Sequence, residues 1–285
     1  MNLDDLKNNI NVWLYGKLNT YYRQKNKVEF VEQHGFVTSH KFSELSLLAV
    51  YYSNDKQLKD KILSFCRKYF KDFNEVKYNT AINKIIDNTK KNKPRLKQID
   101  SIPLPIDVCK RIFHITKNLN APYVVLQKNV CKTLFALVCL SYLEYTLKPE
   151  DDKPIYIYHS YSDLKKTSGI TSFQSFLNVL RFLQTNNIIK VCINGVVHLT
   201  TEFLNNIGFF NVSTNNITVI DYDNLYRYAT VAFDKINNKN PHYKHCRVCG
   251  HLFTNTRNGK LYCQRCAKIV KNYQNVLYYK NKHQN

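Results

Sequence analysis

The sequence predicts a mainly α-helical chain of the α+β class, with a helical N-terminal part, a mixed central part and a small metal-binding C-terminal part. Three observations lead to this prediction. Apolar residues recur at spacings of three and four along most of the first 87 residues, which is the period of one face of an α-helix. Two β-rich arms flank an Asn-Gly pair at 194–195, and two Cys-x2-Cys pairs lie near the C-terminus.

The N-terminal part, residues 1–90, is predicted to be a helical bundle. The apolar positions of its helices are Leu3, Leu6, Ile10, Trp13, Leu14 and Leu18; Leu45, Leu48, Val50 and Tyr51; Leu58, Ile62, Phe65 and Phe70; and Ala81, Ile82, Ile85 and Ile86. The stretch from Phe42 to Ile86 resembles the small helical module that follows the catalytic part of many phage and plasmid primases. This resemblance rests on helical spacing alone and carries no catalytic residue, so a simple helical bundle is the alternative.

Residues 91–105 are predicted to be a linker. The stretch is basic at its start and carries Pro94, Pro103 and Pro105. Prolines and charged residues between two periodic segments are typical of a connection between domains.

The central part, residues 106–240, is predicted to contain helices, short strands and a hairpin. Helices are expected from 106 to 119 and from 124 or 128 to 146, and a short strand from 154 to 158. Ser160 or Ser162 is expected to cap a short helix, Ser168-Gly169 to turn, and Thr171 or Ser172 to cap the next helix. A hairpin at 188–200, a strand at 216–220 and a helix at 224–237 complete this part.

The order of these elements over residues 128–200 resembles a winged helix-turn-helix. The resemblance implies that the third helix enters the DNA major groove and that the hairpin lies near phosphate. The residues it assigns to DNA are Lys165, Lys166, Gln174, Ser175, Asn178, Arg181 and Lys190. Because this set holds few cations and the wing tip is uncharged, contact with protein or dimerisation is the alternative.

The C-terminal part, residues 241–285, is predicted to be a zinc ribbon with a basic tail. Its cysteines are Cys246, Cys249, Cys263 and Cys266, with thirteen residues between the two pairs. Two residues between cysteines let both sulfurs reach one ion, and four thiolates give the tetrahedral shell that Zn²⁺ prefers. A closed shell of four thiolates has a structural role. Between the pairs we expect a hairpin with arms 252–253 and 261–262 around Asn258-Gly259.

These cysteines have two alternative uses, disulfides and a mixed site with histidine. Disulfides are disfavoured because the N-terminal residues are acidic and polar rather than a signal peptide. One of His242, His245 and His251 could replace a cysteine, although four thiolates already complete the shell. The remaining cysteines, expected to be buried thiols of a reducing cytosol, are Cys66, Cys109, Cys131, Cys139 and Cys192.

The charge distribution points to nucleic acid. The chain carries 42 basic and 21 acidic residues, a formal net charge of +21. Residues 241–285 hold nine Lys or Arg and no Asp or Glu, whereas residues 201–240 hold three against four. A biased genome explains a high lysine content but not the absence of acids from one segment. An acid-free basic segment is the footprint of a polyanionic partner.

Within this tail, cations are interleaved with tyrosines that can stack on unpaired bases. The cations that we assign to nucleic acid are Arg247, Arg257, Lys260, Arg265, Lys268 and Lys271; Lys244, Lys280 and Lys282 add to the charge.

The sequence gives little sign of an enzyme or a membrane span. Its seven glycines form no phosphate-binding loop or dinucleotide fingerprint, and His-Glu-x-x-His is absent. Asp221 and Asp223 could hold Mg²⁺, so a metal-dependent nuclease stays open as an alternative. The longest apolar run, 133–143, is shorter than a membrane-spanning helix requires.

The whole arrangement resembles uncharacterised proteins of bacterial phages, plasmids and genomic islands. In these, a helical, winged-helix chain ends in a C-x2-C-G…Y-C-x2-C ribbon, and Gly250 and Tyr262 occupy the matching places. The resemblance implies a DNA-binding protein, of duplex or single strands, that aids replication or regulates a mobile element in the bacterial cytoplasm. The alternative from another class is a factor that binds a host protein complex, such as a defence or polymerase complex.

Overall fold

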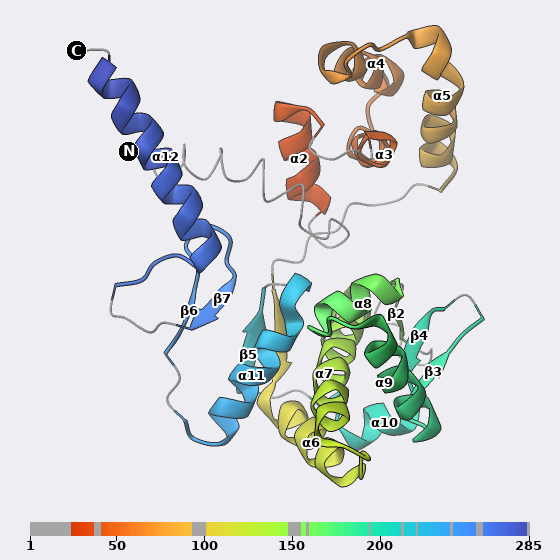
Figure 1. Cartoon of the computed structure of the whole chain (residues 1–285). Coiled ribbons are helices and arrows are strands. Elements are labelled where there is room, and N and C mark those ends of the chain that lie inside the picture. Colours follow the sequence, from red (N-terminus) through yellow and green to blue (C-terminus); the bar gives the residue numbers. More distant parts are fainter. Residues whose placement is uncertain are drawn as a thin grey trace. The chain divides into compact units, whose positions relative to one another are not determined.

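The computed structural model divides the chain into two compact units, Met1–Asp100 and Ser101–Asn285 (Figure 1). The residues that the structure describes are 24–36, 41–92, 101–147, 155–157, 160–193, 195–211, 214–220, 222–239, 242–254 and 259–283. In these residues the chain is mainly helical, with small antiparallel sheets.

The first unit is a helical bundle over its described residues. Its helices are α2 (Gln24–His34), α3 (Lys41–Tyr51), α4 (Leu58–Tyr69) and α5 (Glu75–Asn92). Its buried core contains Val28, Val31, Leu45, Leu48, Ala49, Leu58, Ile62, Leu63, Phe65, Cys66, Ile82 and Ile86. The i, i+3 and i+4 spacing of these residues puts them on one face of each helix, so the bundle closes by burying those faces.

Three of the helices expected in this unit are present. The predicted periods at 45–51, 58–70 and 81–86 correspond to α3, α4 and α5. Helix α2 was not anticipated, because its sequence is mostly polar and few of its described residues, among them Val28 and Val31, are apolar and buried. The period from Leu3 to Leu18 lies outside the described residues.

The second unit combines helices with short sheets. Its elements are β1 (Ile102–Pro105), α6 (Ile106–Asn118), α7 (Val124–Leu147), β2 (Tyr156–Ile157), α8 (Tyr161–Thr167), α9 (Phe173–Thr185), β3 (Ile189–Val191), β4 (Val197–Leu199), α10 (Thr201–Asn206), β5 (Asn216–Val219), η1 (Tyr222–Asn224), α11 (Leu225–Ile236), β6 (Tyr243–His245), β7 (Leu252–Thr254) and α12 (Gln264–His283). The sheets pair β1 with β5, place β4 between β2 and β3, and pair β6 with β7, all antiparallel.

Helix α7 is the central helix of this unit and packs against α6, α8, α9 and α11 (Figure 1). It is buried on most sides between Val130 and Leu143, as expected for a helix that is apolar all round. By length and composition, Val124–Thr146 passes as a candidate membrane span, which the eleven-residue apolar run alone did not suggest. However, 61% of the apolar window is buried inside the fold, which is the position of a core helix.

The α8–turn–α9–hairpin segment follows the predicted order of elements. Ser160 accepts a hydrogen bond from Asp163 N at 3.1 Å, and Ser172 accepts one from Ser175 N at 3.3 Å, so both serines cap helices. Gly169 has φ +63 in the turn, where a side chain would be strained. Strand β4 then pairs with both β3 and β2, which joins the hairpin to the strand that precedes α8.

The predicted linker, 91–105, is partly built into regular structure. Helix α5 continues to Asn92, and β1 occupies Ile102–Pro105. Two prolines fit in β1 because the sheet has only two strands, so each strand has an unpaired edge where no amide donor is needed. The division between the units falls after Asp100.

Candidate metal centre

Local structure of the C-terminal segment brings the four cysteines together. Cys246 follows β6, and its N–H donates to His251 O at 2.9 Å, which continues the β6–β7 pairing past the strands. Gly250 has φ +66 and donates to Cys246 O at 2.8 Å, closing a tight turn that carries Cys249. A left-handed residue is required at the end of such a turn, which explains the glycine.

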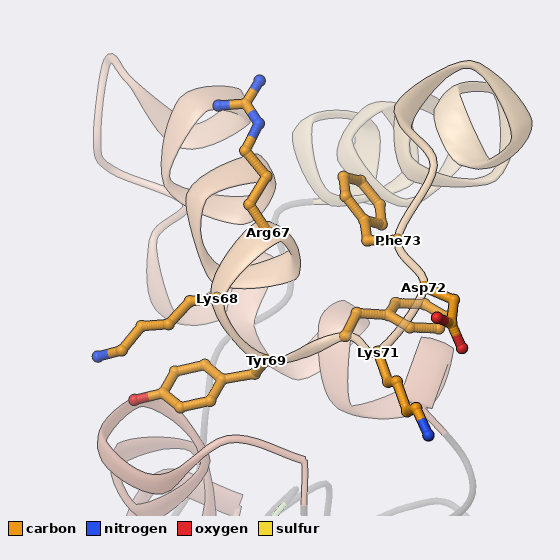
Figure 2. A pocket seen from close by; sticks show the side chains of 7 residues that line it. Arg67, Lys68, Tyr69, Lys71, Asp72 and Phe73 are labelled. Carbon is orange, nitrogen blue, oxygen red and sulfur yellow. The ribbon is translucent and has the colours of Figure 1, made fainter.

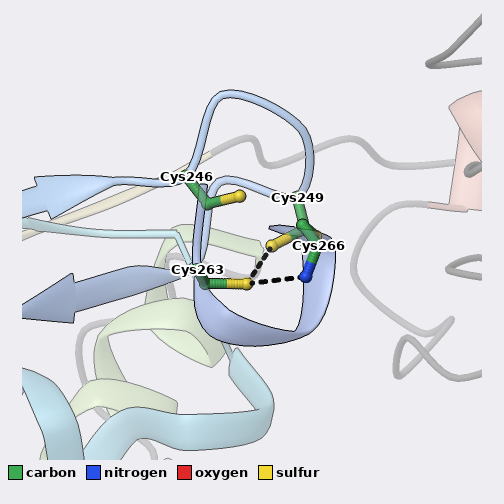
Figure 3. A group of neighbouring side chains, drawn as sticks. All are labelled: Cys246, Cys249, Cys263 and Cys266. Carbon is green, nitrogen blue, oxygen red and sulfur yellow. Dashed lines mark hydrogen bonds between the residues drawn. The ribbon is translucent and has the colours of Figure 1, made fainter. Parts of the chain in front are cut away.

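The second pair is positioned by the start of α12. Cys263 immediately precedes the helix and Cys266 lies in its first turn. Cys266 N donates to Cys263 Sγ at 3.5 Å, so the thiol serves as an acceptor for one of the free N–H groups of the helix end. Figure 3 shows this contact and the four side chains turned toward a common centre.

The sulfur positions match a tetrahedral metal site. The four Sγ atoms all lie within 4.8 Å of one another, and Cys249 Sγ and Cys263 Sγ are 3.8 Å apart. A tetrahedron with metal–sulfur bonds of about 2.3 Å has edges of about 3.8 Å. Disulfide sulfurs lie at about 2.05 Å, and all nine cysteines are free thiols. The cluster can therefore hold a metal ion.

Burial and charge favour the same interpretation. Cys246, Cys263 and Cys266 are buried and Cys249 is half-buried. Hydrogen bonds from the neighbouring thiols lower the pKa of Cys246, whereas the pKa of Cys266 is raised because its thiol is a hydrogen-bond donor to that anion. Four thiols this close cannot all ionise without a cation among them, and a divalent ion would remove that competition.

Two expectations about this segment need correction. The hairpin pairs β7 with β6, not residues 252–253 with 261–262, because the turn around Cys249 closes it from the other side. Leu261 lies outside any strand and instead accepts a hydrogen bond from Arg247 N at 3.0 Å. In the part of the chain that the structure describes, the metal-holding group consists of the four cysteines, without His242, His245 or His251.

The tail cations lie on the surface around this centre. Exposed members of the predicted set are Arg247, Lys260, Arg265, Lys268 and Lys271. Arg257 lies outside the described residues. Lys268 and Lys271 project from α12 on the side away from Cys266 and Val270, which are buried. Helix α12 extends from the metal centre away from β6 and β7 (Figure 1).

The residues predicted to read DNA on the central segment differ in exposure. Arg181, Lys190, Lys166 and Gln174 are exposed, while Lys165, Ser175 and Asn178 are half-buried. The Gln174 amide donates to the Asn178 side chain at 3.1 Å, and Lys165 Nζ donates to Thr171 O at 3.1 Å. Both hydrogen bonds are exposed to solvent, and the assignment of these residues to DNA stays a prediction.

The same segment exposes apolar side chains that were not singled out from the sequence. Phe173, at the start of α9, is 48% exposed, and Ile193, between β3 and β4, is fully exposed. Phe173 is the first residue of α9, a position at the rim of the core rather than inside it. Asp221 and the side chain of Asp223, which could hold Mg²⁺ in the nuclease alternative, lie outside the described residues.

Comparisons with protein-family models, with curated proteins and with solved structures found no match to this chain.

Proposed function

We propose that this protein is a non-catalytic nucleic-acid-binding protein whose C-terminal segment binds DNA around a structural zinc ion. The proposal includes a role in replication or regulation of a phage or another mobile element, in the bacterial cytoplasm. The observation that carries it is the acid-free C-terminal segment, whose described cations are exposed beside a cluster of four thiols.

The arrangement of α12 supports this assignment. Arg265, Lys268 and Lys271 recur every third residue, so they form one broad basic face, and the helix contains no acid. Cations of this kind neutralise phosphates and release counterions, which gives affinity without sequence selection. Tyr278 and Tyr279 are exposed further along the same helix, where rings can stack on unpaired bases.

Zinc is the metal that best fits the donor set. Four thiolates in a tetrahedron are typical of zinc or of iron in iron–sulfur sites. With every position taken by sulfur, the ion would hold Cys246, Cys249, Cys263 and Cys266 and fix the start of α12, and it would leave no place for a substrate. The chain's own contribution is then to present the basic face at a defined angle.

Fluorescence anisotropy with labelled duplex and single-stranded DNA over a salt series tests the proposal. The variant Lys268→Gln/Lys271→Gln should weaken duplex binding and reduce the slope of log K against log salt by about 1.8, at about 0.9 for each lost phosphate contact. The matched control Lys56→Gln/Lys59→Gln removes the same charge from exposed positions at the start of α4. It should keep the wild-type slope. Absence of binding at low salt, or equal slopes for all three proteins, would refute the proposal.

A second function has support from a different observation. The exposed Phe173 lies at the start of α9 and the exposed Ile193 lies in the hairpin that follows this helix, positions where a protein that reads DNA would carry cations. This favours contact between the α8–turn–α9–hairpin segment and another protein. The double variant Phe173→Ser/Ile193→Ser should then lose a host protein that nuclease-treated wild type retains in pull-downs, while Lys268→Gln/Lys271→Gln keeps it. Equal retention by both variants would count against this function.

A further inference from the structure

A basic and aromatic hollow lies on the first unit, at the corner between α4 and α5. Its volume is about 580 Å³, and it is lined by consecutive residues, Arg67, Lys68, Tyr69, Phe70, Lys71, Asp72 and Phe73. The corner is tight because Asp72 adopts φ 59 and Phe73 N donates to Phe70 O at 3.1 Å. Figure 2 shows the side chains around this turn.

Aromatic rings pack together at and next to this corner. Phe70 and Tyr78 stack with centroids 5.0 Å apart, and Phe73 lies nearly parallel to Tyr78 at 6.0 Å. Phe42 lies 5.9 Å from Tyr78 and is 39% exposed. These rings are half-buried at most, so they cover the end of the core and still offer surface to solvent.

Lysines lie directly over several of these rings. Lys41 Nζ is 4.1 Å from the Phe70 centroid, Lys68 Nζ is 4.7 Å from Tyr69, and Lys77 Nζ is 5.4 Å from Tyr78. Such contacts hold the ammonium groups beside the rings. Positive charge and aromatic surface therefore alternate across the corner.

The excess of positive charge is not explained by helix stability. The charged residues at this corner have a net charge of +3. They are five cations, Lys41, Arg67, Lys68, Lys71 and Lys77, and two acids, Asp72 and Glu75. Cations in the last turn of α4, Arg67 and Lys68, stabilise the negative end of that helix. Lys71 lies beyond the helix, however, and Lys77 lies in the first turn of α5, where the helix dipole disfavours a cation.

We propose that this hollow, with its surrounding rings and lysines, binds a single strand of nucleic acid. Phosphates would contact Lys68 and Lys71, and an unpaired base would stack near Phe73. A duplex keeps its base faces covered, so only a single strand can use the rings. The occupant is a strand rather than a small anion, because Lys68, Lys71 and Arg67 point in different directions around the turn (Figure 2).

Arg67 contributes less than the lysines. Its Nη2 is 2.7 Å from Glu75 Oε2, so this cation is already neutralised. Asp72 lies on the opposite side of the turn from Lys68 and on the same side as Lys71 (Figure 2), so its carboxylate offsets part of the positive charge at Lys71 only. This site goes beyond the proposed function, because it belongs to the first unit and shares no residue with the metal centre.

Photocrosslinking tests the site in the full-length protein. A single-stranded oligonucleotide that contains 4-thiothymidine is bound at low salt, irradiated, and the attached peptides are mapped by mass spectrometry. Crosslinks within residues 67–78 are expected, and an excess of unlabelled duplex should not remove them. Crosslinks confined to other segments at saturation, or equal loss with duplex, would overturn the proposal.

Binding measurements give an independent readout. Lys68→Gln/Lys71→Gln should lower the salt slope for single strands by about 1.4, at about 0.7 per phosphate, and leave the slope for duplex unchanged. Phe73→Leu should weaken single-strand binding about fivefold or more, the low end for one stacked base. The Lys56→Gln/Lys59→Gln control should match wild type, and circular dichroism should show that each variant melts as wild type does.

The two proposals fail in different ways. If Lys268→Gln/Lys271→Gln has no effect on duplex binding while residues 67–78 still crosslink, the proposed role of the C-terminal segment is wrong and the site on the first unit stands. If both lysine pairs in the first unit behave alike toward single strands, the hollow is not a binding site, whatever the C-terminal segment does.

Discussion

Replacing one ligand of the four-cysteine cluster is the most direct perturbation of this protein. Cys249→Ser removes a thiolate and leaves a hydroxyl, which is a far weaker ligand for zinc. Its control is Cys192→Ser, the same chemical change at another half-buried thiol that lies outside the cluster. Both variants are tested as full-length proteins, since the rest of the second unit contacts the C-terminal segment through Tyr243 and Asp234, 2.8 Å apart.

The structure sets the scale of the expected effect. Apart from the cysteines, the buried side chains among the described residues after 241 are Leu252 and Val270. Burying two such side chains contributes about 3–6 kcal/mol, whereas a structural zinc ion contributes about 10–16 kcal/mol in small zinc domains. On the proposed zinc assignment, the ion would therefore be the main source of order in this segment. Loss of an outer contact already costs about 10–100-fold in metal affinity, so loss of a ligand should cost at least 100-fold, or about 2.7 kcal/mol.

Chelator competition measures this difference. The purified protein should release one zinc ion per chain, detected with a colorimetric zinc reagent, and Cys249→Ser should release its metal at a chelator concentration at least 100-fold lower. Trypsin should then cut the chain faster after residues such as Lys268 and Lys271, while the cutting pattern of the first unit stays unchanged. A wild-type protein without metal, or identical release curves for Cys249→Ser and Cys192→Ser, would refute the assignment.

Three further predictions concern the second unit, each measured by chemical denaturation. Gly169→Ala should destabilise it by about 2–4 kcal/mol, because a left-handed alanine costs about 1–2 kcal/mol and its Cβ would lie 2.4 Å from the Tyr226 ring; an unchanged midpoint would contradict the turn geometry. Thr133→Val should leave the free energy of unfolding unchanged or raise it by about 1 kcal/mol, since this buried hydroxyl lacks a hydrogen-bond partner among the described residues. Thr116→Val should lower the free energy of unfolding by about 1 kcal/mol, because it removes a hydrogen bond of 2.7 Å to the backbone carbonyl of Ile112. Equal effects of the two threonine variants would contradict this difference in hydrogen bonding. Ser172→Ala should cost about 1 kcal/mol through loss of the α9 cap, and a neutral result would show that the cap contributes nothing.

Features that depend on neighbouring residues could be predicted from the sequence. The caps of α8 and α9 use a serine next to the first helical residue, and the turn between them uses Gly169. The four-cysteine cluster follows from the spacing of two short pairs, because each pair spans a single turn. In each case the physical cause lies within a few positions of the residue concerned.

Features that depend on residues distant in the chain could not be predicted from the sequence. The strand at Leu252 pairs with β6, which precedes the first cysteine pair, and an Asn-Gly signal downstream gave the wrong partner. Helix α2 forms although its sequence is mostly polar, because α3 provides the surface that it covers. The hollow at residues 67–73 depends on the left-handed Asp72 and on rings from α3, α4 and α5, so it was not predicted from the sequence.

The continuity of α12 gives the metal cluster a mechanical consequence. Cys266 is part of a helix of 20 residues, which is about 30 Å long. Because the helix is continuous, a rotation of about 10° of its first turn, which carries Cys266, would displace its far end by about 5 Å. Small differences in coordination geometry, such as those between one metal and another, would thus be magnified into a different reach for the far end of the chain.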